Sequence, residues 1–189
     1  MIIVTNLKVL TSVIFSSKSG VSTALESLAF AIGDPGDIFV MAFPTYPRFA
    51  SDISERAGIK LMGPALRAEN NFMLRWILIF KWNSIMYTYT FCSFIFNNTF
   101  NSTWRPDEIE AYIEGLKVQG HNVKAYIHCN PNNPLGDVYN EDQNLALMKI
   151  CAKHQMHFIS DEIYALSIHN TEMGKNFKRL VFTAKYEFT

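Results

Sequence analysis

Two short stretches, Cys129–Tyr139 (CNPNNPLGDVY) and Phe158–His169 (FISDEIYALSIH), decide the fold predicted for this chain. The first begins where an apolar run, Val123–Cys129, ends, and the second overlaps another such run, His157–Ser160. Both runs are typical of buried strands, and a helix is predicted between them over Glu141–His154. A strand, a helix and a second strand in this order predict a parallel pair. The polar residues of both stretches would then lie beyond the carboxyl ends of the strands, where open α/β sheets bind ligands.

The rest of the chain continues the alternation of strands and helices. Apolar residues at helical spacing from Val21 to Ile32 predict a helix, which Gly33 and Pro35 end before a turn at Asp34–Asp37. Three further strands are predicted: a buried parallel strand at Ile2–Thr5, and strands at Ile38–Phe43 and Ile59–Met62. Two further helices are predicted: one with Phe49, Ile53 and Ala57 on one face, and one from Pro106 with Ile109, Tyr112, Ile113 and Leu116 on one face. This pattern predicts an α/β fold with a mostly parallel sheet flanked by helices.

Composition narrows the classes of function. The 189 residues suit one domain or a piece of a larger one, and 17 basic residues balance 17 acidic ones. Without a basic tract or an acidic tail, neither a nucleic acid nor a basic protein is expected as a partner. The three cysteines, Cys92, Cys129 and Cys151, form no CxxC pair, and the histidines show no metal spacing. A reduced, cytoplasmic setting is therefore expected, without a disulfide framework or a metal site.

The two opening stretches resemble the cofactor-binding core of the fold-type-I enzymes that use pyridoxal 5'-phosphate (PLP), the superfamily of class I and II aminotransferases. Within it, NPLGDVY followed by DEIYALS looks most like the animal 1-aminocyclopropane-1-carboxylate (ACC) synthase-like proteins. An Asn-Pro turn or DEIY alone would say little. Their combination, with Asp161 28 positions after Asn133 (161 − 133), is specific. The resemblance implies an incomplete PLP-dependent transferase large domain over residues 1–189, without the N-terminal arm and the C-terminal small domain.

The resemblance also implies a cradle for the phosphate and a stacking face for the ring. Gly20-Val21-Ser22-Thr23 stands at a helix start, where backbone N–H groups attract an anion, so Val21 and Ser22 are candidate phosphate ligands. The alternative is an ordinary Ser or Thr N-cap. Tyr46, in FPTYP, would lie over the pyridine ring. Its alternative is a loop tyrosine packed on the sheet.

Three further residues would contact the ring's polar atoms. By resemblance, Asp161 pairs with the protonated pyridine nitrogen, while Tyr164 and Asn133 donate to the phenolate oxygen. The alternative for Asp161 and Tyr164 is a helix N-cap next to a packed aromatic ring. For the Asn130-Pro131 and Asn133-Pro134 turns, a cis X–Pro bond is expected at one of the two.

The lysine that holds PLP covalently in the family is expected to be absent from this chain. In the family it lies in a Ser-x-Ser-Lys-type loop well after the DEIY stretch, followed by an arginine. Lys185 stands too close to Asp161 and lacks the following glycine and arginine, and Lys18 precedes the phosphate cradle. No catalytic residue is therefore assigned.

Three segments depart from the family pattern. Residues 7–19 separate the first strand from the phosphate cradle, and residues 73–100 separate the third strand from the helix at Pro106. Both are expected to be insertions, with a retained intron as the hypothesis for their origin. The tail from about residue 178 is also atypical. An alternative for Phe72–Phe96 is a membrane-spanning helix, but its charge-free part is short of the ~20 residues that a span needs.

Two functions of different classes follow. The first is a PLP-binding fragment of an aminotransferase or ACC synthase-like enzyme that acts on α-amino acids, inactive as written without the lysine. Loss of the substrate's α-proton would be the first step of either reaction. The full enzyme is expected to be a homodimer, without nucleic acid or membrane partners. The second is a non-catalytic PLP-binding or dimer-interface protein.

Overall fold

The computed structural model describes residues 2–6, 20–65 and 106–168. The chain divides into two units, residues 1–64 with 106–189 and residues 65–105, and every helix and strand given below belongs to the first unit. The expected insertions at 7–19 and 73–100, the tail from residue 178, and both Lys18 and Lys185 lie outside the described residues.

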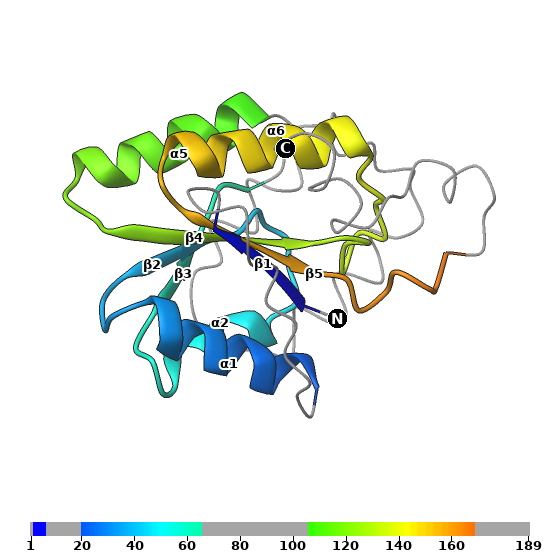
Figure 1. Cartoon of the computed structure of the whole chain (residues 1–189), viewed down its shortest axis with the longest axis horizontal. Coiled ribbons are helices and arrows are strands. Elements are labelled where there is room, and N and C mark those ends of the chain that lie inside the picture. Colours follow the sequence, from blue (N-terminus) through cyan, green and yellow to red (C-terminus); the bar gives the residue numbers. More distant parts are fainter. Residues whose placement is uncertain (1, 7–19, 66–105, 169–189) are drawn as a thin grey trace. The chain divides into compact units, whose positions relative to one another are not determined.

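A five-stranded sheet forms the centre of the first unit (Figure 1), with strand order β1-β5-β4-β2-β3. The strands are β1 (Ile2–Asn6), β2 (Ile38–Val40), β3 (Lys60–Met62), β4 (Val123–Cys129) and β5 (His157–Asp161). Parallel pairing joins β3 to β2, β2 to β4 and β4 to β5. The predicted α/β class with a mostly parallel sheet is confirmed.

The prediction that Ile2–Thr5 forms a parallel strand was wrong. The strand exists, but β1 pairs antiparallel with β5, with Ile2 opposite Asp161 and Asn6 opposite His157. A run of β-branched residues predicts an extended segment in a sheet. It carries no information on the direction of pairing, because both ladders satisfy the backbone hydrogen bonds.

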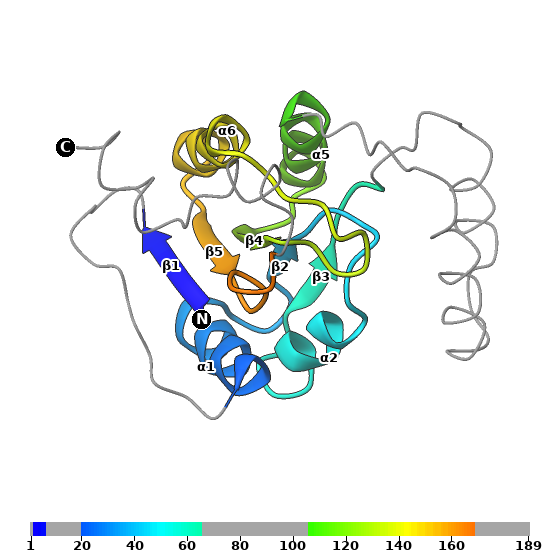
Figure 2. The ribbon, with the colours of Figure 1, turned by 90° about the vertical axis from the view of Figure 1, so that its right-hand side faces the viewer.

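Helices cover both faces of the sheet (Figures 1 and 2). On one face lie α1 (Val21–Ile32) and α2 (Arg48–Ser54), and on the other α5 (Pro106–Val118) and α6 (Glu141–Lys153). All four were predicted to within a few residues. The predicted strand Ile38–Phe43 stops at Val40, although Met41 N still donates to Met62 O. Phe43 N likewise donates to Pro64 O, and Pro44, which has no N–H, ends this series of bonds.

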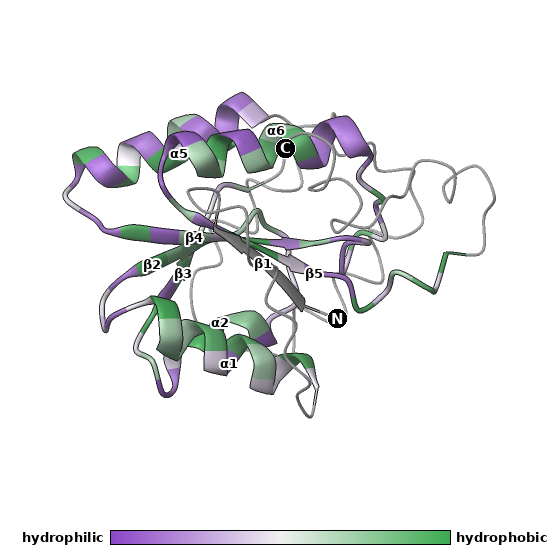
Figure 3. Cartoon of the chain, viewed as in Figure 1, coloured by the Kyte–Doolittle hydropathy of each residue, from purple (hydrophilic) through white to green (hydrophobic). Residues whose placement is uncertain are grey.

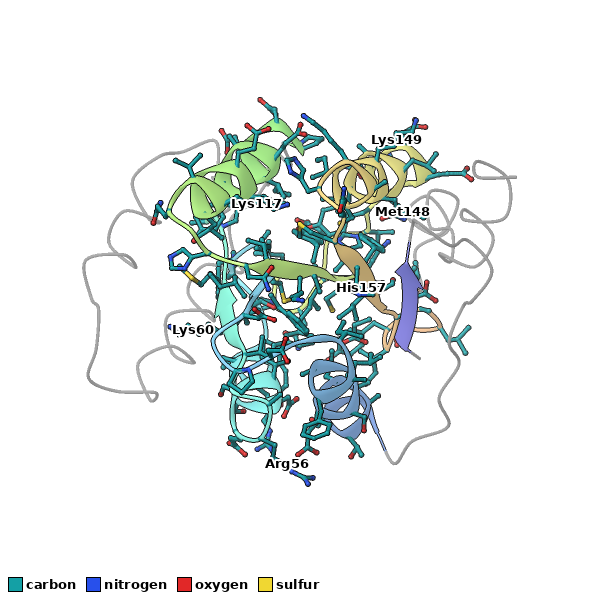
Figure 4. All side chains as sticks on the ribbon, turned by 60° about the vertical axis from the view of Figure 1, so that its left-hand side comes forward. Arg56, Lys60, Lys117, Met148, Lys149 and His157 are labelled. Atoms are coloured by element: carbon teal, nitrogen blue, oxygen red, sulfur yellow. The ribbon has the colours of Figure 1, made fainter. Side chains whose placement is uncertain are left out.

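Each face of the sheet has its own apolar core. Toward α1 and α2, the sheet residues Phe39, Ile127 and Ile159 pack with Leu25 and Ile53. On the other face, the rings of Tyr126 and Phe158 stack at 6.2 Å. Figure 4 shows Met148 of α6 directed toward the sheet and Lys149 directed away from it. Helices that pack one face on a sheet need both apolar and polar residues, and Figure 3 shows this mixed hydropathy in α5 and α6.

A buried polar pair interrupts the second core. His128 Nε2 lies 3.0 Å from Asn144 Oδ1, and the His128 ring also contacts the ring of Tyr139, at a centroid distance of 4.8 Å. Burial lowers the pKa of His128 to about 4. The imidazole is therefore neutral at pH 7, donating one hydrogen bond to Asn144.

Across the part of the chain that the structure describes, no helix is both long and apolar enough to cross a bilayer. The segment Phe72–Phe96, with its alternative of a membrane span, lies outside that part.

Candidate functional site

Three adjacent strand ends define the candidate site. Because β2, β4 and β5 are parallel neighbours, the segments that follow them emerge at one edge of the sheet. Figure 2 shows this edge, with the loop after β4 and the turn after β5 facing the viewer. Helix α1 begins at the same end of the sheet, on the right of Figure 1. All six sequence-predicted site residues belong to these segments.

Asp161, the last residue of β5, is a carboxylate whose burial is only partly offset by its hydrogen bonding. Its exposure is 2%, and one carboxylate oxygen, Oδ1, accepts a hydrogen bond from Ile163 N at 3.1 Å. The hydrogen bond from Ile163 N lowers the pKa of this carboxyl, but the opposing effect of burial is larger. Burial raises the pKa of Asp161 to about 6. A cationic N–H donor at the second oxygen would remove this penalty.

The alternative interpretation of Asp161, a helix N-cap, does not hold. Asp161 ends a strand, and the residues after it, 163–166, form a turn. Its Oδ1 accepts a hydrogen bond from Ile163 N and so stabilises the start of this turn.

Asn133 and Tyr164 are brought into contact by the fold. Asn133 Nδ2 donates to the Tyr164 hydroxyl at 3.2 Å. Because that hydroxyl oxygen accepts, its own proton can be donated to a third group, and the amide of Asn133 has a second N–H. The backbone N–H of Asn133 also hydrogen-bonds the sulfur of Cys129. Two donors therefore stand together beside the strand end that carries Asp161.

Tyr46 lies in the segment that leads from β2 to α2. Its ring meets Phe49 edge-to-face, at a centroid distance of 6.1 Å and an interplanar angle of 85°. Phe49 is buried and Tyr46 is 42% exposed. A buried neighbour thus holds one edge of the ring while much of the side chain is open for contact with a flat ligand.

At the start of α1, the N-cap is Gly20, and no side chain caps the helix. The alternative of a Ser or Thr N-cap is therefore wrong. Gly20 has a φ of 100°, which favours glycine, and its carbonyl accepts from Ala24 N at 3.3 Å. The N–H groups of Val21 and Ser22 belong to the first turn, which has no intrahelical acceptors, and the Ser22 side chain is exposed. This end is suited to an anion.

Of the six predicted residues, a direct hydrogen bond within the described chain joins one pair, Asn133 and Tyr164. Asp161 lies three residues before Tyr164, and Tyr46, Val21 and Ser22 share the edge of the sheet without bonding to the others. The Asn130-Pro131 and Asn133-Pro134 bonds are both cis, where one cis bond was expected.

Sequence reasoning missed Asn130 and Asn132. Both are buried, with exposures of 3% and 8%, and both hydrogen-bond within the loop after β4. The only signal for them is the repeated asparagine in NPNNP, because this side chain can replace backbone donors and acceptors in turns.

Comparisons with known proteins show the family of the chain. The model of the family "Aminotransferase class I and II" matches residues 88–186. The chain belongs to this family. The match includes the loop after β4, all of β5 and the turn after it, so it covers Asn133, Asp161 and Tyr164.

Two curated relatives are similar over most of the chain. The 1-aminocyclopropane-1-carboxylate synthase 2 of Oryza sativa is 30% identical over 152 residues, covering 80% of this chain and 25% of the relative. The probable aminotransferase tcpI of Claviceps purpurea is 31% identical over 153 residues, covering 81% of this chain and 28% of the relative. The chain thus spans about a quarter of the length of the relatives it matches.

Solved structures share the fold. A PLP-bound putative aminotransferase from Clostridium difficile 630 has a TM-score of 0.53 at 21% identity, covering 93% of this chain and 36% of that one. An aspartate aminotransferase mutant from Thermus thermophilus has a TM-score of 0.56 at 22% identity, covering 83% of this chain and 32% of that one.

Proposed function

We propose that this chain binds PLP at the carboxyl edge of its sheet and forms the cofactor-binding part of an aminotransferase or ACC synthase-like enzyme acting on α-amino acids. The observation that carries the proposal is the position of Asp161, a buried carboxylate whose pKa burial raises to about 6, three residues before the Tyr164 that hydrogen-bonds Asn133. Membership of the aminotransferase class I and II family supports it.

The residues present fit the polar atoms of the cofactor ring. Asp161 would hold the protonated pyridine nitrogen, whose positive charge and N–H would offset the cost of burying this carboxylate. Asn133 and Tyr164 would donate to the phenolate oxygen, using the amide N–H and hydroxyl proton that their mutual hydrogen bond leaves available. A carboxylate on one side and two neutral donors on the other fix the orientation of the ring.

The chain also offers partners for the phosphate and for the ring face. The N–H groups of Val21 and Ser22 and the Ser22 hydroxyl would bind the phosphate at the start of α1. Tyr46, supported by Phe49, would cover the ring and exclude water from one side of it. When bound, PLP supplies an electron sink for the bond that breaks at the substrate's α-carbon. Asp161 serves that chemistry by keeping a proton on the pyridine nitrogen.

We further propose that PLP binds to this chain without a covalent bond to lysine, so that the chain by itself is inactive. Neither Lys18 nor Lys185 has the sequence context of the family's lysine. Binding would then rest on the phosphate contacts, stacking and the Asp161 pair, and would be reversible. A non-catalytic PLP-binding or dimer-interface role is the alternative to a part of an active enzyme.

A binding and reduction experiment on the full chain tests both points. We expect saturable binding of PLP, complete release on dialysis, and no PLP-modified peptide after borohydride treatment. Absence of saturable binding would contradict the proposed function. A borohydride-stable adduct on any lysine of this chain would refute only the non-covalent mode.

Sequencing the transcript tests the larger context. We propose that residues 7–19 and 73–100 are insertions into a large domain, and that the complete enzyme is a cytoplasmic homodimer that acts on α-amino acids. A transcript that lacks the codons for both segments and continues into a lysine loop would support an active enzyme. A transcript that contains them and stops after Thr189 would favour the non-catalytic role.

A further inference from the structure

Asn130, the first residue of the loop after β4, bonds to the far end of that loop and to the neighbouring strand β5. Its Nδ2 donates to Tyr139 O and its Oδ1 accepts from Tyr139 N, both at 3.1 Å. Its backbone N–H donates to Asp161 O at 3.0 Å. With an exposure of 3%, Asn130 makes these bonds away from water, where unmade bonds are costly. One residue thus closes the loop and connects it to the strand end that carries Asp161.

A second set of hydrogen bonds lies inside the closed loop. Asn132 N donates to Asp137 O at 2.9 Å, Gly136 N donates to Asn132 O at 3.0 Å, and Leu135 N donates to Asn132 Oδ1 at 3.1 Å. None of these three bonds involves an atom of Asn130. They surround Asn133, whose side chain reaches Tyr164.

We propose that Asn130 is a positioning residue: its paired hydrogen bonds to Tyr139 hold the loop closed, and the closed loop fixes Asn133 against Tyr164. The consequence for cofactor binding rests on the proposed function, in which Asn133 donates to the phenolate oxygen. The structural consequence does not depend on it, because the loop is closed by this chain's own atoms.

Asn144 provides a matched control. It is also a buried asparagine, with the same exposure of 3%, but its side chain bonds His128 under α6 instead of the loop. Replacing either asparagine by alanine removes buried hydrogen bonds and lowers global stability. Only replacement of Asn130 should open the loop locally.

The experiment is amide hydrogen exchange of the full chain without added PLP, comparing wild type, Asn130→Ala and Asn144→Ala. We expect the amides of Asn132, Leu135 and Gly136 to exchange roughly tenfold faster or more in Asn130→Ala. In Asn144→Ala they should keep their wild-type rates. Unchanged rates in Asn130→Ala, or equal acceleration in both variants, would overturn the proposal.

A conservative variant and a binding measurement complete the test. Asn130→Asp keeps the acceptor for Tyr139 N and loses the donor to Tyr139 O, so the amides of its loop should exchange at an intermediate rate. This variant also tests the proposal if the alanine variant does not fold.

If wild type binds PLP, Asn130→Ala should raise the Kd for PLP about tenfold or more, and Asn144→Ala should leave it near the wild-type value. An unchanged Kd in Asn130→Ala would overturn the role toward the cofactor. If wild type does not bind PLP, the proposed function fails, and the exchange rates alone decide whether Asn130 holds the loop.

Discussion

Asn133 donates a hydrogen bond to the hydroxyl of Tyr164 at 3.2 Å, although 31 positions separate the two residues in the chain. The contact forms because β4 and β5 are parallel neighbours, with Cys129 opposite Asp161 at their ends. The loop after one strand and the turn after the other therefore meet at the same edge of the sheet. This contact connects the two stretches of sequence that predict the fold.

Removing either member of this pair should weaken PLP binding. For Asn133→Ala and Tyr164→Phe we expect a loss of about 0.5–1.5 kcal/mol each, the usual contribution of one hydrogen bond. Because the two side chains bond each other, the double variant should lose less than the sum. Equilibrium dialysis of the four proteins gives the coupling free energy. Tyr112→Phe on α5, a half-buried tyrosine that hydrogen-bonds the backbone of Gly63, is the control and should bind normally. Strict additivity would show that the two donors act independently.

The free energy of unfolding should depend on pH through two opposing groups. Asp161 has its pKa raised from 3.8 to about 6, so its contribution is present below pH 3.8 and is lost as the pH rises through 6. His128 has its pKa lowered from 6.5 to about 4, so its contribution is present above pH 6.5 and is lost as the pH falls through 4. Each amounts to about 3 kcal/mol. Between pH 4 and 6.5 the changes in these two contributions to the free energy of unfolding should therefore nearly cancel.

Two variants separate these contributions in urea unfolding without cofactor. Asp161→Asn leaves the His128 contribution, so its unfolding free energy should rise by about 3 kcal/mol from pH 4 to 6.5. His128→Gln leaves the Asp161 contribution, so its value should fall over the same range. The pKa of His157, also lowered by burial, adds in the direction of His128. Equal pH slopes in Asp161→Asn and wild type would show that the carboxyl titrates normally.

Gly63 should not tolerate a side chain. A Cβ built at Gly63 overlaps the carbonyl oxygen of Met41, a backbone atom that cannot rotate away. Gly63→Ala should therefore cost roughly 1–3 kcal/mol or more, measured by urea unfolding. Gly115, inside α5, is the matched control, because a Cβ there meets nothing within 4 Å. Gly115→Ala should stabilise the protein by about 0.8–1 kcal/mol, the helix propensity difference. Equal effects at the two positions would contradict the close approach at Met41.

Hydrophobic patterns were sufficient to predict most of the fold. The predicted strand at Val123–Cys129 coincides with β4, and the helix at Val21–Ile32 coincides with α1. These elements carry continuous apolar runs or a regular apolar face, which the chain must bury whatever its neighbours are. The direction of β1 could not be predicted in this way, because it depends on which strand lies at the edge of the sheet.

The site was predicted less completely than the fold. By resemblance, Asp161, Asn133 and Tyr164 were assigned to one site, and the structure brings the last two into contact. Asn130 was missed because its partner, the backbone of Tyr139, has no side-chain signature in the sequence. A hydrogen bond to the backbone becomes visible only when the path of the loop is known.

If the strand ends hold PLP through Asp161, the affinity for PLP must depend on that carboxylate. The most direct test measures the affinity for PLP at pH 7 of the full chain and of two variants. Wild type should bind saturably, Asp161→Asn should bind at least tenfold more weakly because the pyridinium loses its counter-ion, and Glu114→Gln on the exposed side of α5 should bind as wild type does. Absence of saturable binding by wild type, or equal affinity in wild type and Asp161→Asn, would contradict the account.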